Sequence, residues 1–163
     1  MMENMNLQTK IGRLASFIRD LYKEEDIPLH KPTFVGNEKE YVSECIESNY
    51  VSSVGDLVAK FEQEICCFVG VKRAVATVNG TSALHLALLT AGVEFNDEVL
   101  CQGLTFVATA NAIKYIGADP IFIDVDKDTL GMSPLALESW LQKNAKQNSR
   151  RELINKNTGR RIK

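Results

Sequence analysis

The chain has 163 residues, of which 45% are hydrophobic and 25% are charged, and its formal net charge is −2 at pH 7. These values indicate one globular domain that is large enough to bury a core. No apolar run reaches the ~18 residues of a membrane span, and the N-terminus lacks the basic and then apolar order of a secretory signal, so we expect a cytoplasmic protein with no membrane contact.

The first predicted element is a helix over residues 7–22, followed by an extended arm. The apolar residues of the helix recur at helical spacing, at Leu7, Ile11, Leu14, Ile18 and Leu21. This pattern predicts an amphipathic helix with a polar outer face, which we interpret as a packing arm and not as a membrane anchor. Residues 24–34 contain two prolines and are predicted to be extended. We therefore place a boundary between an N-terminal helix and arm, residues 1–36, and a larger domain over residues 37–163.

Two further helices, over residues 37–48 and 56–70, are expected on either side of the loop "NYVSSVG". The chain's four cysteines are Cys45, Cys66, Cys67 and Cys101. They form no CxxC pair, and adjacent cysteines are poorly placed for a mutual disulfide. We expect four reduced core thiols and no metal site.

Three strand-and-helix units follow one another along the chain. Strand "AVATV" (74–78) leads to a helix over 81–91, strand "EVLCQ" (98–102) to a helix over 107–116, and strand "PIFIDV" (120–125) to a helix over 134–145. Apolar strands that alternate with helices are typical of a parallel sheet covered on both faces. The sequence therefore predicts an α/β domain.

The turn "NGTS" (79–82), between the first strand and its helix, predicts an anion site. Gly80 lets a ligand approach the backbone closely, and the first helical turn presents N–H groups without helical partners. An ATP-type loop is excluded because residues 75–82 contain no Lys. The alternative is an ordinary N-cap in which Thr81 or Ser82 satisfies the helix donors.

Ligands of open α/β sheets collect at the carboxyl ends of the strands. Segments 79–82, 103–106 and 124–126 each follow a predicted strand, so we expect them at one edge of the sheet. A phosphate site beside the ring of Phe106 suggests a flat, phosphorylated cofactor. Packing of Phe106 in the core is the alternative that the residue by itself favours.

The last stretch of the chain, residues 143–163, contains eight basic residues and one acid, Glu152. Such a tail can indicate nucleic-acid binding, but it has no aromatic residue for base stacking. A solvated helix end followed by a loop explains its charge equally well. We expect no nucleic-acid partner.

Three segments resemble one enzyme family: "NGTSALHLALLTAGVEFNDEVL", "LTFVATANAI" and "GADPIFIDVDKDTLGMSP" are similar to the N-terminal half of the DegT/DnrJ/EryC1/StrS nucleotide-sugar aminotransferases. The stretch "IPLHKPTFVGNEKEYVSECIESNYVSSVG" resembles the branch that aminates a UDP-linked 4-keto-6-deoxy sugar in nonulosonic acid synthesis of the legionaminic type. The likeness covers most of residues 18–163. It implies a truncated part of the large domain of fold type I enzymes, three-layered with a mainly parallel sheet, and a homodimer.

The resemblance also implies pyridoxal 5′-phosphate as the cofactor and glutamate as the amino donor. Gly80, Thr81 and Ser82 would cradle the cofactor phosphate, and Phe106 would stack on its ring. The loop "NYVSSVG" and the arm around Phe34 would lie near the sugar nucleotide.

No catalytic residue is assigned, because the family's reactive lysine and its acid for the pyridine nitrogen come from later in the chain. Among twelve lysines, Lys114 is the best candidate, but we interpret its helix as packing with Ile113 and Ile116 toward the sheet. We interpret Asp124 as a turn residue.

The stretch "NKNTGRRIK" resembles the loop and opening residues of the family's next strand, so we expect an N-terminal fragment with an exposed sheet edge. Two small departures from the family are Gly103, in place of a small side chain, and Asn96, in place of a frequent glycine. The alternatives to part of an enzyme are a catalytically inactive chain with a structural or dimerisation role, and a module that binds a phosphate ligand.

Overall fold

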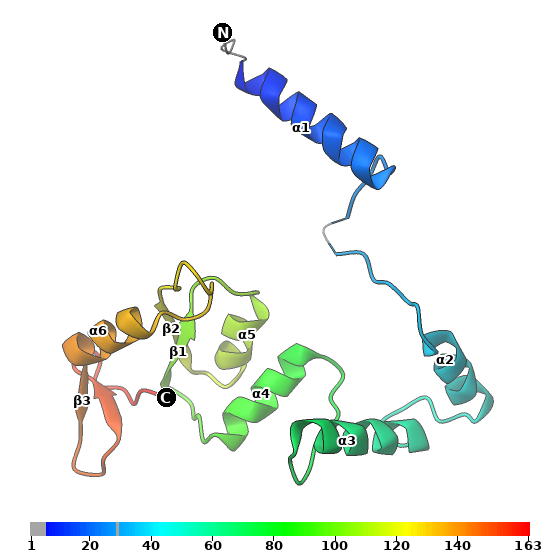
Figure 1. Ribbon diagram of the computed structural model, residues 1–163. Coiled ribbons are helices and arrows are strands. Elements are labelled where there is room, and N and C mark those ends of the chain that lie inside the picture. The colour runs from blue at the N-terminus through cyan, green and yellow to red at the C-terminus, as the bar shows by residue number, and fades with distance from the viewer. Residues whose placement is uncertain (1–5, 29) are drawn as a thin grey trace. The chain divides into compact units, whose positions relative to one another are not determined.

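The computed structural model describes residues 6–28 and 30–163 (Figure 1). It divides the chain into two compact units, Met1–Leu57 and Val58–Lys163. Within the described residues no helix is long and apolar enough to cross a membrane.

The first unit contains two helices, α1 (Leu7–Tyr22) and α2 (Glu38–Glu47), both close to their predicted bounds. The side chain of Asn6 accepts a hydrogen bond from Gln8 N at 2.9 Å and begins α1. Lys23 ends the helix with a left-handed backbone, φ +55°, and its N–H donates to Arg19 O. Between the two helices, Lys31 and Glu24 form an exposed ion pair, which we expect to contribute little stability.

The second unit begins with the greater part of α3 (Asp56–Val69). Gly70, with φ +75°, ends this helix by donating to Cys66 O. The predicted strand over 74–78 is wrong, since the structure assigns no strand there. A strand needs a hydrogen-bonded neighbouring strand, whereas Ala76 N in this segment donates to the Glu62 side chain of α3, to Oε1 at 2.8 Å.

The two later strand predictions are confirmed. β1 (Glu98–Gln102) and β2 (Asp119–Ile123) pair in parallel, with Glu98 opposite Asp119 and Cys101 opposite Phe122. Parallel strands need a crossover, and α5 (Ala108–Tyr115) supplies it. The expected parallel arrangement is therefore present, with two paired strands where we predicted three units.

Helices cover both sides of this strand pair. Figure 1 shows β1 and β2 between α5 and α6 (Pro134–Asn144). α4 (Gly80–Thr90) packs against α5. The buried core consists of Val93, Val99, Cys101, Ile113 and Ala118, with Leu88 and Ile116 packed against it.

The cysteine prediction is right in one respect and wrong in another. All four are free thiols, but Cys101 alone is buried; Cys45 and Cys66 are half-buried and Cys67 is exposed. Burial raises the pKa of the Cys101 thiol. In the described chain, no group of three His, Cys, Asp or Glu residues could hold a metal ion.

The C-terminal stretch contains an antiparallel hairpin that we did not predict, β3 (Ala145–Gln147) with β4 (Leu153–Asn155). The chain then returns to the sheet, where Ile162 pairs in parallel with Glu98. Lys163 N donates to Glu98 O at 2.8 Å, and Leu100 N donates to Lys163 O at 3.1 Å. Residues 161–163 therefore lie beside β1 through these backbone hydrogen bonds, where we had considered a solvated loop.

Candidate functional site

The carboxyl ends of β1 and β2 lie side by side. Gly103 N, just after β1, donates to Ile123 O, the last residue of β2, at 3.0 Å. The loops over residues 103–107 and 124–133 leave from this edge. Two of the three segments that we expected to meet are therefore neighbours, and the third begins α4, the helix that packs on α5.

The turn before α4 is built around Asn79. Its side-chain oxygen accepts from Ser82 N at 2.9 Å, and its carbonyl accepts from Ala83 N at 3.1 Å. Thr77 Oγ1 also donates to Asn79 O at 3.0 Å. The capping residue is thus Asn79, not Thr81 or Ser82 as the alternative interpretation had it. Asn is a preferred N-cap residue, so the sequence contained the information that we missed.

Gly80 faces open space in this turn. A Cβ added at Gly80 would meet no heavy atom of the described chain within 4 Å, and its φ is not in the left-handed region. Neither packing nor backbone conformation therefore requires glycine here. Close approach of a ligand would require it, and the N–H groups that begin a helix are suited to a phosphate. Thr81 and Ser82, which follow, are half-buried.

Phe106 is 79% exposed, so the interpretation as core packing is wrong for the described chain. It lies in the loop between β1 and α5, where Gln102 Nε2 donates to Leu104 O at 2.6 Å. The hydroxyls of Thr105 and Thr109 are 2.9 Å apart and join this loop to the first turn of α5. An aromatic ring held by an ordered loop at the carboxyl edge is free to cover the face of a flat ligand.

The loop after β2 is organised by two aspartates. Asp126 Oδ1 accepts from the N–H groups of Asp128 and Thr129, and these backbone hydrogen bonds lower the pKa of Asp126. Asp124 Oδ1 accepts from Val125 N at 2.8 Å. Both carboxylates satisfy the turn's own backbone, as expected for turn residues. Neither is positioned by this bonding to act on a ligand.

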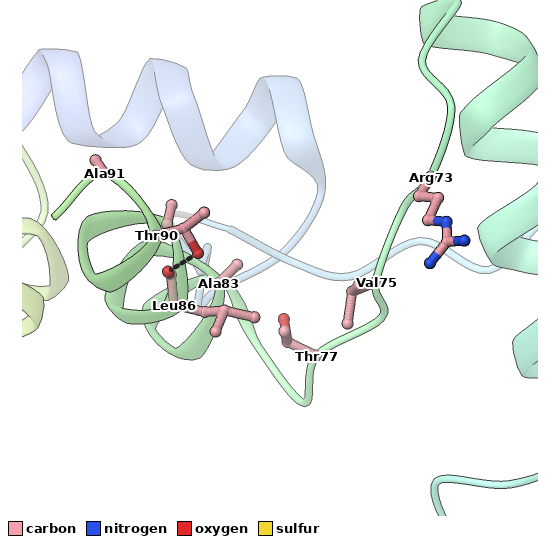
Figure 2. A pocket seen from close by; sticks show the side chains of 8 residues that line it. Arg73, Val75, Thr77, Ala83, Leu86, Thr90 and Ala91 are labelled. Carbon is pink, nitrogen blue, oxygen red and sulfur yellow. Dashed lines mark hydrogen bonds between the residues drawn. The ribbon is translucent and has the colours of Figure 1, made fainter.

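An open groove of about 610 Å³ lies beside the turn that precedes α4, between α4 and residues 73–77 (Figure 2). It is lined by Arg73, Val75, Thr77, Ala83, Leu86, Ala87, Thr90 and Ala91. The hydroxyl of Thr90 donates to Leu86 O at 2.8 Å, so this helix face satisfies its own polar group. Neither Gly80 nor Phe106 lines the groove, and its walls are mainly apolar apart from Arg73 and the two threonines, so we do not assign the phosphate site to it.

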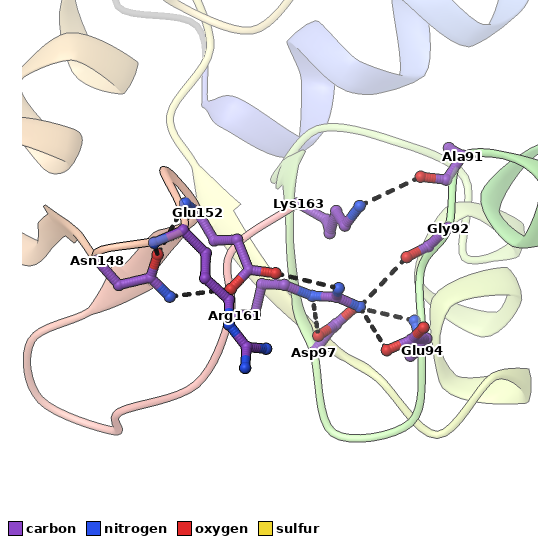
Figure 3. Close-up of polar contacts among 9 residues, drawn as sticks. Ala91, Gly92, Glu94, Asp97, Asn148, Glu152, Arg161 and Lys163 are labelled. Atoms are coloured by element: carbon purple, nitrogen blue, oxygen red, sulfur yellow. Dashed lines mark hydrogen bonds and ion pairs between the residues drawn. The ribbon is translucent and has the colours of Figure 1, made fainter.

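At the opposite, amino-terminal edge of the strands lies a charged cluster (Figure 3). Arg161 donates to Asp97 through Nε at 2.9 Å and through Nη2 at 2.7 Å. Asn155 Nδ2 donates to Glu98 Oε2 at 2.7 Å, and both of these side chains are buried. Arg160 pairs with Asp119, the first residue of β2. Two of the tail's eight basic residues, Arg160 and Arg161, are thus paired with acids at this edge, which composition alone could not predict.

Lys114 belongs to this opposite edge as well. Its Nζ lies 2.5 Å from Asp119 Oδ1, at the start of β2, and its side chain is 55% exposed. The hydrogen bonds from Lys114 and Arg160 lower the pKa of Asp119. Lys114 is therefore an ion-pair partner at the amino-terminal edge of the strands, away from Phe106.

Comparisons with known proteins agree with this arrangement. Residues 32–147 match the model of the DegT/DnrJ/EryC1/StrS aminotransferase family. The chain is 45% identical over 120 residues to GDP-perosamine synthase of Escherichia coli O157:H7, covering 74% of this chain and 33% of that protein. It is 41% identical over 115 residues to GDP-perosamine synthase of Caulobacter vibrioides, covering 71% and 31%. The chain thus spans about a third of the length of the curated relatives that it matches.

Solved structures that superpose on this chain are aminotransferases as well. An aminotransferase from Psychrobacter cryohalolentis superposes with a TM-score of 0.61 at 34% identity, covering 69% of this chain and 29% of that one. A protein from Streptococcus pneumoniae, assigned as a sugar aminotransferase and solved in its PLP form, superposes with a TM-score of 0.62 at 26% identity, covering 70% and 29%.

Proposed function

The chain belongs to the DegT/DnrJ/EryC1/StrS aminotransferase family, and on that premise we propose that it forms the N-terminal part of an enzyme dependent on pyridoxal 5′-phosphate. Its fold is part of the large domain of fold type I enzymes of this cofactor class. The proposed reaction transfers an amino group, with glutamate as donor, to the keto group of a nucleotide-linked sugar.

The observation that carries the proposal is the open, capped first turn of α4. Asn79 fixes the turn through Ser82 N, and Gly80 leaves the backbone accessible, so the N–H groups of Gly80 and Thr81 are suited to hold the cofactor phosphate. We assign the Ser82 hydroxyl as one further donor to this phosphate. These residues fit a phosphate because they offer hydrogen-bond donors and no side chain that blocks approach.

Phe106 supplies the second element of the proposed site. Its exposed ring would cover one face of the pyridine ring and exclude water from it. When bound, pyridoxal phosphate supplies the electron sink that such amino transfers need. We assign no proton-transferring group to this part of the chain, since its best candidate, Lys114, is held by Asp119 at the other edge of the strands.

For the substrate we propose a UDP-linked 4-keto-6-deoxy sugar in nonulosonic acid or surface-glycan synthesis. The support is the likeness of residues 27–55 to that branch of the family. Relatives of this chain include GDP-perosamine synthase, whose name contains a different nucleotide. The choice of UDP over GDP therefore depends on the likeness of residues 27–55 alone. We further propose a homodimer in which the arm around Phe34, 76% exposed, and the loop over 49–55 approach the sugar nucleotide.

Calorimetric titration of the chain with pyridoxal phosphate and with inorganic phosphate tests the cofactor assignment. A ring stack adds about 0.5–1.5 kcal/mol beyond the area that it buries, which is about two- to tenfold in affinity, so we expect pyridoxal phosphate to bind at least about twofold more tightly. Equal affinities would show a general anion site and would favour the phosphate-binding module over part of an enzyme.

A hybrid enzyme tests the substrate assignment. Residues 27–147 would replace the corresponding third of Escherichia coli GDP-perosamine synthase, and amination of UDP-linked and GDP-linked 4-keto-6-deoxy sugars would be compared. We expect the ratio of kcat/KM values to move toward the UDP sugar. An active hybrid with an unchanged ratio would contradict the nucleotide assignment and leave the family assignment intact.

A further inference from the structure

The N-terminal helix α1 carries an apolar stripe that the family fold does not explain. The family match begins at residue 32, after α1 has ended. No residue of α1, all of which is described, is buried. Four of the stripe's side chains are exposed to between 57% and 70%: Leu7, Ile11, Leu14 and Leu21. An ordered stripe of this kind marks an interaction surface.

The spacing of the stripe is that of a coiled coil. Its members recur at intervals of four, three, four and three residues, which is a heptad repeat with leucine at each d position (Leu7, Leu14, Leu21) and isoleucine at each a position (Ile11, Ile18). A β-branched residue at a with leucine at d favours a parallel two-stranded coiled coil. We propose that α1 pairs in parallel and in register with α1 of a second copy of this chain.

The charges of α1 agree with self-pairing. The e and g positions beside the seam hold one charged residue, Lys10, and its partner position in the other copy holds Ala15, so no like charges meet across the seam. The next g position, Phe17, faces the e position Tyr22 of the other copy, and this pair extends the apolar contact. The other charged residues of α1 fall at the outward b and c positions.

The length of α1 sets how strong this contact is. Sixteen residues make a helix of about 24 Å, shorter than the three to four heptads of an independent coiled coil. α1 therefore adds affinity to other contacts between two copies, because a linked second contact forms at a high effective concentration. The proposal does not depend on the cofactor or on the sugar.

Disulfide trapping of the full chain tests the geometry directly. In a parallel, in-register pair, residue 14 of one copy faces residue 14 of the other, so Leu14→Cys should form a disulfide between identical peptides that mass spectrometry identifies. The matched control is Ser16→Cys, at an outward f position, with Cys67→Ser in both proteins to remove the exposed native thiol. A Leu14→Cys link to any other segment, or equal linking through Ser16→Cys, would overturn the proposal.

Sedimentation of the full chain measures the affinity. We expect Ile11→Asn or Ile18→Asn to raise the dimer dissociation constant at least about tenfold, and Thr9→Asn, on the outward face, to leave it unchanged. Circular dichroism checks that helix content is kept. A chain that stays monomeric, or a dimer insensitive to Ile11→Asn that gives no cross-link at residue 14, would refute self-pairing. Binding of the monomer to anionic phospholipid vesicles through the same stripe would refute it as well.

Discussion

Arg161 donates two hydrogen bonds to the Asp97 carboxylate. This bidentate pair joins the C-terminal end of the described chain to the residue just before β1 (Figure 3). Sixty-four residues separate the two in sequence. Asp97 is 5% exposed, which makes this a largely desolvated pair. Geometry of this kind is specific to arginine, whose planar fork matches a carboxylate.

Arg161→Gln should lower the free energy of unfolding by about 1–3 kcal/mol, because Asp97 would lose its main charged partner while staying buried. Arg150→Gln, at the exposed tip of the hairpin, is the matched control and should change it by less than about 0.5 kcal/mol. Urea unfolding followed by circular dichroism measures both. Equal effects would show that Arg161 acts only through the net charge of the tail.

Stability should fall in acid through the same pair. Burial raises the pKa of Asp97, but the hydrogen bonds from Arg161 and Glu94 N outweigh burial and hold it below the usual value of 3.8. A carboxyl whose folded pKa is depressed stabilises the protein above its unfolded pKa, and this stabilisation is lost as the pH falls below about 4 through the folded pKa.

Urea midpoints at pH 7, 5 and 3 check this dependence. The unmutated chain should lose stability between pH 5 and pH 3, and Arg161→Gln should lose less over the same interval, because removing the guanidinium raises the folded pKa of Asp97. Parallel losses in the two proteins would assign the acid sensitivity to other carboxylates, such as Asp119.

Gly80→Val should weaken binding of pyridoxal phosphate more than Phe106→Leu does. Hydrogen bonds to a charged phosphate contribute about 1.5–3 kcal/mol each, whereas a ring stack adds about 0.5–1.5 kcal/mol. Because a Cβ at Gly80 meets open space, we expect the substitution to block ligand approach with little loss of packing. Thr81→Ala should have a small effect, since the backbone N–H remains. Calorimetric dissociation constants in the reverse order would reject the turn over residues 79–82 as the phosphate site.

Gly117→Ala should destabilise the second unit by more than about 1–2 kcal/mol, the cost of a left-handed backbone at a residue with a Cβ. Gly117 has φ +79°, and its added Cβ would lie 2.5 Å from the ring of Phe95. Gly159→Ala is the control, because its φ is +72° but no atom of the described chain lies within 4 Å of the added Cβ. The difference between the two unfolding free energies isolates the clash, and a difference of zero would mean that the Phe95 ring moves aside freely.

Lys114 should not react selectively with pyridoxal phosphate. Its ammonium group is paired with Asp119 at the edge away from Phe106, so we expect borohydride reduction and peptide mapping to find it labelled no more than other surface lysines. Stoichiometric labelling of Lys114, with loss of binding in Lys114→Met, would show that the site lies at that edge.

Local patterns in the sequence were enough to predict the helices and the strands β1 and β2. Periodicity placed α1 and α5 within a residue or two, and the apolar run before Asp124 placed β2, because these features depend on side chains near one another in the chain. The glycine turn before α4 and the aromatic loop after β1 were also evident, because their chemistry lies in short contiguous segments. Asn96, in place of a glycine, adopts φ +70°, a conformation that asparagine tolerates.

Only the tertiary structure decided which distant residues meet. Ala74–Val78 has the composition of a strand, yet no strand forms there, because a strand depends on a hydrogen-bonded neighbour that composition cannot specify. The tail has the composition of a solvated basic segment, yet Arg160 and Arg161 are bound by acids more than 40 residues away in sequence. Such ion pairs and sheet pairings are fixed by the path of the backbone through space, and that path depends on the burial of Val99, Ile113 and their neighbours as one core.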